Sequence, residues 1–170
     1  MPSATILIVE DEERVRSALR RSLRRTTHDL LVAESGNAAL ALLEQEAVDV
    51  ILSDDCMPGM SGIQLLRQAR LVKPCAARLM LTDRAGLETA MEAVRCGDID
   101  RFLTKPWADG ELREALDTAA EKVRAAAAAR AEEVAAARRD EDVTRAPAHN
   151  GGRGGAGGSA ARLPKTGPSW

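Results

Sequence analysis

The stretch VDVILSDDCMPGMSG (residues 48–62) decides the fold class of this chain. Its first part, residues 48–53, is a short run that is apolar on both faces, which is typical of a central strand in a parallel sheet. The run ends in Asp54 and Asp55, and the chain then turns at Pro58-Gly59. Because carboxylates at the end of a buried strand are costly to desolvate, the pair indicates a site that uses negative charge.

The same alternation of short apolar runs and amphipathic stretches continues over most of the sequence. Apolar runs predict five strands, at residues 5–9, 30–33, 48–53, 77–82 and 101–104. A stretch with helical spacing follows each strand, at 11–26, 36–46, 61–70, 85–97 and from 107 onward. Five strand–helix units predict an α/β fold with a parallel sheet covered on both faces. Because crossovers are right-handed, the most economical topology is a doubly wound (βα)5 parallel sheet in the flavodoxin-like order 2-1-3-4-5.

Residue types at the ends of these segments mark where two of the helices begin or end. Ser61 is a typical N-cap for the third helix, and Gly97 is a typical stop for the fourth. In the fourth helix, the spacing of apolar residues predicts a face toward the core, made of Leu87, Ala90, Met91 and Val94.

The composition changes after about residue 124. Residues 1–124 form the predicted globular domain, residues 125–143 an Ala-rich helical C-terminal extension of the fifth helix, and residues 144–170 a disordered Gly- and Pro-rich tail. The extension has two interpretations: a weak coiled-coil seam that would support a homodimer, or a solvated helix. We interpret LPKTG (163–167), which matches a sortase pattern, as chance or a tag.

Composition and charge exclude several classes of protein. The chain has 170 residues, 45% hydrophobic but 2% aromatic, so its core must be aliphatic. A formal net charge of −2 gives no sign of direct nucleic-acid binding. Without a signal-peptide pattern or an apolar run near the roughly 20 residues of a membrane helix, we expect a cytoplasmic protein that does not contact a membrane. The three cysteines lack CxxC spacing and indicate reduced thiols, and we interpret His28 and His149 as surface residues.

Acidic residues gather at the carboxyl ends of two predicted neighbouring strands. Glu10 and Asp11 end the first strand, and Asp54 and Asp55 end the third. The ends of these strands share one edge of the sheet, where such folds bind ligands. Each pair of carboxylates about 4 Å apart costs about 4 kcal/mol at an effective dielectric near 20. A divalent cation offsets this repulsion, and oxygen-only ligands favour Mg²⁺.

Two further residues at the same edge suit an anion. Thr82 ends the fourth strand, and Lys105 follows the fifth. Carboxylates, Mg²⁺, a lysine and a hydroxyl together describe a phosphoryl-transfer site, in which an aspartate can be the nucleophile. Each residue alone has an ordinary interpretation, as a helix cap, a turn or a solvated lysine, and their coincidence at consecutive strand ends favours the site. Alternation along a strand places one of Asp54 and Asp55 in the pocket but does not say which.

At these residues the sequence resembles the receiver domains of two-component response regulators, the fold of the chemotaxis response regulator, over about residues 5–123. ILIVEDE (6–12) is similar to the family's first strand and acidic pair, and DDCMPGMSG (54–62) to its phosphorylation loop. LMLT (79–82) and RFLTKPW (101–107) resemble its fourth and fifth strands. Together, in order and at matching spacing, the four motifs are highly specific.

The resemblance implies a role for each matching residue. Asp54, four residues before the proline, would be the phosphoacceptor, and Asp55 would lie outside the reacting centre. Lys105 would bind the phosphoryl group, and Thr82 and Phe102 would be the switch residues. The implied Mg²⁺ ligands are Glu10, Asp11, Asp54 and the backbone carbonyl of Cys56. The Lys105-Pro106 bond would be cis.

The resemblance also implies a function. A histidine kinase or histidine phosphotransfer protein would donate a phosphoryl group to Asp54, with no enzymatic activity beyond self-phosphotransfer and autodephosphorylation. The acyl phosphate would draw Thr82 toward it and turn Phe102 inward. This population shift would remodel the face formed by the fourth helix, fifth strand and fifth helix, and so control an unidentified downstream protein.

Two positions depart from the family pattern. Asp83 stands where a small residue is usual, so we expect it to slow phosphorylation by small molecules, with Arg84 able to offset its charge. Cys56 stands where a long polar residue is more usual, and we expect it to tune hydrolysis rather than to serve a redox role.

Three alternatives stay open. The chain could be the receiver part of a longer regulator whose output domain, a cyclic-dinucleotide phosphodiesterase or a transcription activator, is missing, because RFLTKPW (101–107) most resembles such receivers. It could be a phosphorylation-incompetent scaffold in which Asp83 closes the site. A phosphatase with an aspartyl nucleophile ranks lowest, because that class has a second aspartate two residues after the nucleophile, where this chain has Cys56.

Overall fold

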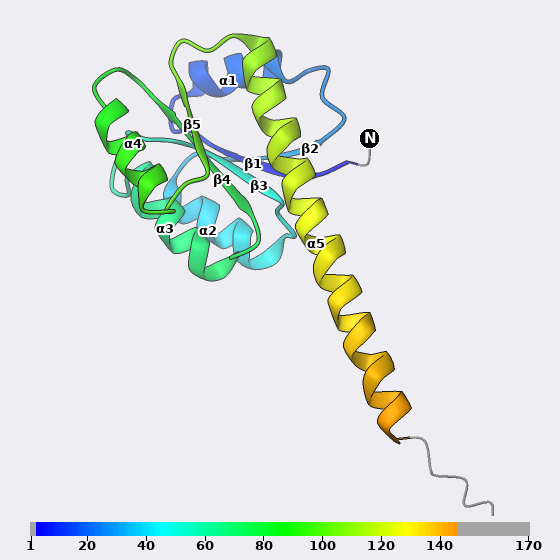
Figure 1. The fold of residues 1–170 in the computed structure, drawn as a ribbon. Coiled ribbons are helices and arrows are strands. Elements are labelled where there is room, and N and C mark those ends of the chain that lie inside the picture. Colours follow the sequence, from blue (N-terminus) through cyan, green and yellow to red (C-terminus); the bar gives the residue numbers. More distant parts are fainter. Residues whose placement is uncertain (1–2, 146–170) are drawn as a thin grey trace, which may run out of the picture. The chain divides into compact units, whose positions relative to one another are not determined.

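The computed structural model describes residues 3–145, with side chains as far as residue 141 (Figure 1). Strands and helices alternate strictly along this part of the chain. The strands are β1 (Thr5–Val9), β2 (Asp29–Ala33), β3 (Val50–Asp54), β4 (Ala77–Thr82) and β5 (Arg101–Thr104). The helices are α1 (Glu13–Ser22), α2 (Gly36–Gln45), α3 (Gly62–Val72), α4 (Leu87–Arg95) and α5 (Asp109–Arg145).

The five strands form one parallel sheet in the order β2-β1-β3-β4-β5. The predicted α/β class, doubly wound arrangement and flavodoxin-like order are therefore confirmed. The third strand differs from its predicted limits of 48–53, because β3 begins at Val50 and includes Asp54. At its start, the Asp49 carboxylate accepts a hydrogen bond from the Thr5 backbone N–H at 2.8 Å. At its end, Asp54 pairs with Leu81 of β4, so the first aspartate belongs to the strand and Asp55 follows it.

One face of the sheet is covered by α1 and the first part of α5 (Figure 1). Alternate residues of the central strands point to this side, as the two-residue period of a strand requires. The helices contribute mainly leucine and alanine, so the core is aliphatic, as the composition predicts. Its fully buried leucines and isoleucines include Ile6, Ile8, Leu19, Leu52, Leu79, Leu112 and Leu116.

The other face is covered by α2, α3 and α4 (Figure 1). The intervening strand residues point here, and Phe102 of β5 packs against this cluster while half-buried. Both faces are therefore buried, which explains why the strands are apolar without alternation. The buried residues of this side include Leu7, Val9, Leu43, Ile51, Leu65, Leu66, Met80 and Ala90.

The predicted ends of α3 and α4 are confirmed. Ser61 caps α3, and its hydroxyl accepts from Gln64 N while the Gln64 side chain accepts from Ser61 N, a complete capping box. Gly97 follows α4 with φ of 71°, a left-handed conformation that favours glycine.

The predicted core face of α4 is wrong in part. Ala90 and Ala93 are buried, whereas Met91 is 54% exposed and Val94 is 38% exposed. The two alanines, three residues apart on one side, allow this short helix to approach the sheet closely. The larger apolar side chains then lie toward its outer side.

His28 was expected at the surface, and this expectation is wrong. Its imidazole is buried, and Nδ1 accepts a hydrogen bond from the Ala4 backbone N–H at 3.2 Å. The proton therefore resides on Nε2, which donates to Asp117 Oδ1 of α5 at 2.8 Å. The histidine joins the start of β2 to α5, a partnership between residues 89 positions apart that local spacing does not reveal.

The chain divides into two units, and the boundary between them falls after Glu133, within α5. The predicted tail of residues 144–170 begins too early, because α5 continues through Thr144 and Arg145. The rest of it, with His149 and LPKTG (163–167), lies outside the described residues. No helix within residues 3–145 is both long enough and apolar enough to cross a membrane.

Candidate functional site

Three carboxylates meet where β1 and β3 end. Glu10 and Asp11 follow β1, and Asp54 is the last residue of β3. The two strands are parallel neighbours, so their carboxyl ends lie side by side and these residues come together. One oxygen from each of the three residues lies within 4.8 Å of the others. Glu10 and Asp54 are 1% and 3% exposed, and Asp11 is more accessible. The sequence-based prediction that the acidic residues share one edge of the sheet is realised by these three.

Lys105 enters this acidic group from the end of β5. Its Nζ lies 2.5 Å from Asp54 Oδ1 and 3.2 Å from Glu10 Oε2. The contact with Glu10 is a hydrogen bond, whereas the contact with Asp54 is an ion pair without good hydrogen-bond geometry. The next peptide bond, Lys105-Pro106, is cis, as the resemblance implied.

Burial has the largest influence on the electrostatics of the site, and the neighbouring charges add to it or oppose it. Burial raises the pKa of Asp54, and the nearby Lys105 only partly offsets it. Burial also raises the pKa of Glu10, and the charge of Asp54 adds to the effect. Although burial alone would lower it, the pKa of Lys105 is raised because Asp54 and Glu10 favour the ammonium form. The site therefore has excess negative charge that one lysine does not balance, which suits a further cation.

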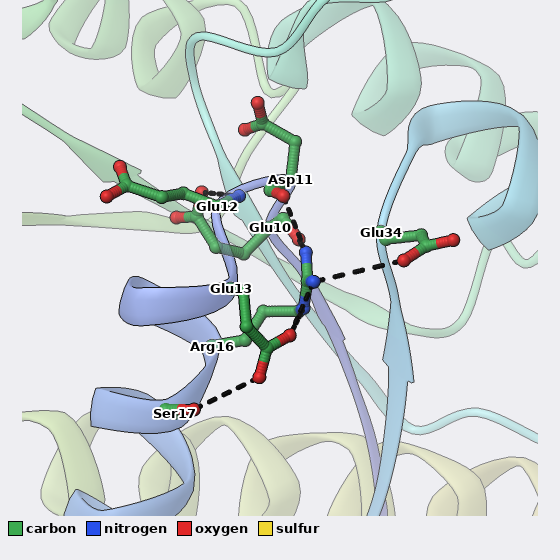
Figure 2. A network of polar contacts seen from close by, with 7 residues as sticks. All are labelled: Glu10, Asp11, Glu12, Glu13, Arg16, Ser17 and Glu34. Carbon is green, nitrogen blue, oxygen red and sulfur yellow. Dashed lines mark hydrogen bonds and ion pairs between the residues drawn. The ribbon is translucent and has the colours of Figure 1, made fainter.

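Arg16 of α1 binds the backbone of Glu10 and Asp11, and the sequence did not predict this role. Its Nη1 donates to the backbone carbonyls of Glu10 and Asp11 at 2.8 and 2.6 Å (Figure 2). The same guanidinium pairs with Glu13 at 2.6 Å and lies 3.8 Å from Glu34. The residue is 9% exposed although it is charged. A usable signal was its position three residues before Leu19, on the buried side of the helix.

Thr82 is fully buried at the end of β4, and its hydroxyl contacts Asp55. Oγ1 donates to Asp55 Oδ2 at 2.5 Å and also lies 3.2 Å from the Asp83 carbonyl oxygen. Asp55 is not one of the three clustered carboxylates, and that it lies outside the reacting centre stays a prediction. The second aspartate turns away from the carboxylate cluster, as strand alternation requires, but it reaches the hydroxyl at the next strand end.

The loop after β3 is closed by Gly62. A Cβ atom at this position would lie 1.9 Å from the Asp54 carbonyl oxygen, so a side chain there is excluded. Its backbone N–H donates to the Asp55 carbonyl at 2.9 Å, and the Ser53 hydroxyl donates to the Asp54 carbonyl at 2.9 Å. The backbone around the two aspartates is thus fixed on both sides.

Asp83 and Cys56 are the two positions that depart from the family pattern. The Asp83 carboxylate accepts from the backbone N–H groups of Ala85 and Gly86 at 2.8 and 3.0 Å, so it shapes the turn that leads into α4. Cys56 is exposed, and the charge of Asp55 is the main cause that raises the pKa of its thiol. A raised pKa lowers the thiolate fraction at neutral pH, and the role of Cys56 stays a prediction.

Comparison with known proteins identifies the family. The family model described as response regulator receiver domain matches residues 6–117. The chain belongs to this family. It is 38% identical over 118 residues to the response regulator protein FleR of Pseudomonas aeruginosa, in an alignment that covers 69% of this chain and 24% of FleR. The chain thus spans about a quarter of the length of that relative.

Solved structures agree with this receiver assignment. A structure described as adenylate cyclase from Rhodopirellula baltica is 34% identical with a TM-score of 0.72, and the match covers 78% of this chain and 97% of that one. The signal receiver domain of an HD domain-containing protein from Pseudomonas fluorescens Pf-5 is 32% identical with a TM-score of 0.68, covering 73% of this chain and 99% of that one. The strand order and the acidic cluster described above are therefore those of a receiver domain.

Proposed function

We propose that the chain is a phosphoacceptor module that takes a phosphoryl group on Asp54. The observation that carries this proposal is the position of Asp54, which is buried among carboxylates and paired with Lys105 at 2.5 Å. A buried aspartate in such surroundings is costly unless its charge is used. In a receiver domain that use is nucleophilic attack.

The chemistry follows from the carboxylate and its neighbours. An oxygen of Asp54 attacks the phosphorus of a phosphohistidine on a kinase or phosphotransfer protein. The new bond is P–O, the P–N bond breaks, and its electron pair returns to the imidazole nitrogen. Lys105 neutralises charge on the transferred group, since it already lies between Asp54 and Glu10. Attack of water on the phosphorus later releases inorganic phosphate and restores the carboxylate.

Glu10, Asp11 and Asp54 fit a hard divalent cation. Their oxygens are of the type that Mg²⁺ prefers. Burial is the main cause that raises the pKa of Glu10 and Asp54, the charge of a neighbouring aspartate adds to it, and a bound cation would stabilise the ionised forms. The Asp54 Oδ1 atom is buried 2.5 Å from Lys105 Nζ and makes no hydrogen bond of good geometry, so its charge is incompletely compensated. The backbone carbonyl of Cys56 would complete the set from the protein. When bound, the ion would neutralise charge on the phosphoryl oxygens.

Thr82 and Phe102 would transmit the effect of phosphorylation at Asp54 to the surface of the domain. Thr82 is buried at the end of β4, one strand from Asp54, and its hydroxyl is a donor for a phosphoryl oxygen. Phe102 lies two residues along β5 from Thr104, the strand partner of Thr82, and it is half-buried against the core. Movement of the two would alter the face of α4, β5 and α5 that a downstream protein binds.

A second candidate function is that of the receiver part of a longer regulator. The observation that favours it is the coverage of 24% of FleR. In that case the same site would control an attached output domain, a transcription activator or a cyclic-dinucleotide phosphodiesterase. A longer reading frame in the source genome would support this alternative. The helix α5, which runs to Arg145, offers a homodimer contact in either case, and sedimentation at two concentrations tests it.

Beryllofluoride, which mimics the aspartyl phosphate, tests the proposal. Trp107 follows Lys105 closely, and its Nε1 donates to Ser22 Oγ at 3.0 Å, so its fluorescence reports on this region. A Trp170→Phe background removes the other tryptophan. We expect saturable binding that requires Mg²⁺ and is lost in Asp54→Asn, but not in the control Asp49→Asn at the opposite end of β3. No response in a folded wild-type chain would favour the scaffold alternative.

A further inference from the structure

Asp55 engages the hydroxyl that the proposed function assigns to the phosphoryl group. Thr82 Oγ1 lies 2.5 Å from Asp55 Oδ2, at the short end of the range for a hydroxyl and a carboxylate. A hydroxyl has a single proton to donate. While Thr82 donates to Asp55, it cannot also donate to a phosphoryl oxygen on Asp54.

The surroundings of the pair limit the space around it. Thr82 is fully buried, and Gly86 at the start of α4 packs directly against both side chains. A Cβ atom at position 86 would lie 2.0 Å from Asp55 Oδ2 and 2.2 Å from Thr82 Oγ1. Because Gly86 has an ordinary φ of −87°, its lack of a side chain matters here for space and not for backbone strain.

The backbone holds Asp55 in reach of Thr82. Its N–H donates to the Leu81 carbonyl at 3.0 Å, which continues the pairing of β3 with β4 beyond Asp54. Its own carbonyl accepts from Gly62 N–H at 2.9 Å. The carboxylate is therefore positioned by two main-chain contacts and aimed across to the end of the neighbouring strand.

From these contacts we propose that Asp55 is a positioning residue that restrains Thr82 in the unphosphorylated domain and so opposes activation. The inference rests on the proposed function of Asp54. A phosphoryl group on Asp54 must draw Thr82 away from a charged acceptor, which raises the free energy of the activated state. Asp55 thereby sets how far phosphorylation shifts the switch, and it acts through Thr82 rather than on the phosphorus.

The test compares beryllofluoride affinity, in saturating Mg²⁺, among variants at positions 55 and 82. Loss of a hydrogen bond to a charged acceptor corresponds to about a tenfold change, so Asp55→Ala should bind about tenfold tighter than the wild type. Asp55→Asn, which keeps an uncharged acceptor of the same shape, should fall between them. In a Thr82→Ala background, Asp55→Ala should change affinity by no more than about twofold, because the restrained hydroxyl is gone.

Two further variants separate this role from general effects. Glu88→Gln removes an exposed charge two residues beyond Gly86 and should leave the affinity unchanged. Gly86→Ala must displace the pair and should mimic Asp55→Ala. Circular dichroism and cooperative unfolding confirm that each variant is folded.

The outcomes are distinct. Tighter binding that depends on Thr82 supports the inference. A wild type that binds beryllofluoride, with Asp55→Ala equally tight, overturns the inference and leaves the proposed function standing. An equal gain with and without the Thr82 hydroxyl shows an effect of charge alone and also overturns it. If no variant binds, the proposed function fails and the inference fails with it.

Discussion

Replacing Arg16 should weaken both the fold and the acidic site. The guanidinium donates to the carbonyls of Glu10 and Asp11 at 2.8 and 2.6 Å, and Arg16→Ala leaves both without this donor. Hydrogen bonds from a charged donor contribute about 1.5–3 kcal/mol each, so two at the lower limit give about 3 kcal/mol. The ion pairs with Glu13 and Glu34 add little, since these side chains are 66% and 78% exposed.

Urea unfolding, followed by circular dichroism and by Trp107 fluorescence, measures this loss. With a slope of about 1.5 kcal/mol per molar, the urea midpoint of Arg16→Ala should fall by about 2 M. Arg16→Lys, which keeps the charge but has one ammonium in place of the planar fork, should lose about half as much. Arg20→Ala, an exposed arginine one turn further along α1, is the matched control and should change stability by less than about 0.5 kcal/mol.

The same variant should also bind Mg²⁺ more weakly. Arg16 fixes the backbone from which Glu10 and Asp11 project (Figure 2), and loss of such support commonly costs 10–100-fold in metal affinity. Mg²⁺ titrations of thermal stability measure the effect. If Arg16→Ala were as stable as Arg20→Ala and bound Mg²⁺ as tightly as the wild type, the argument from the carbonyl contacts would be refuted.

Three other perturbations have defined outcomes. Because burial raises the pKa of Asp54, the folded chain binds that proton more tightly than the unfolded chain, and stability falls as pH rises from the ordinary carboxyl pKa through the raised one. Metal-free Asp54→Asn should therefore be more stable than the wild type at neutral pH, on the order of 1 kcal/mol, with the gap closing at acidic pH; an equal or lower urea midpoint would contradict this. Gly62→Ala should lose about 3 kcal/mol, because the new Cβ meets backbone, whereas Gly110→Ala, with open space, should lose none in the same urea assay. Asp83→Ala should be phosphorylated faster by acetyl phosphate. An unchanged rate would refute the expectation that this carboxylate slows phosphorylation of Asp54.

The strand ends were predictable from the sequence because they follow from the alternation of strands and helices. Parallel strands bring their carboxyl ends to one edge, so the proximity of Glu10, Asp54 and Lys105 followed once the strand order was assumed. The start of β3 was misplaced by two residues because Val48 is apolar and buried like the strand residues, whereas the strand pairs with its neighbours only from Val50.

The polar contacts between distant segments were not predictable in the same way. Arg16 binds backbone carbonyls, and any residue type supplies a carbonyl, so no sequence pattern marks its targets. His28 forms a hydrogen bond with Asp117, 89 residues away in the sequence, and Asp55 accepts one from Thr82 at the end of the next strand. Periodicity assigns a residue to a face but does not say which side chain on another element it meets.

Peptide mapping of the phosphorylated residue tests the central claim most directly. The chain is treated with acetyl phosphate and Mg²⁺, and borohydride then reduces the acyl phosphate to homoserine, which marks the position in the peptide that spans residues 48–62. The account predicts homoserine at Asp54, none at Asp55, and none when Mg²⁺ is removed. Homoserine at Asp55, or none at either position in a folded chain, would contradict it.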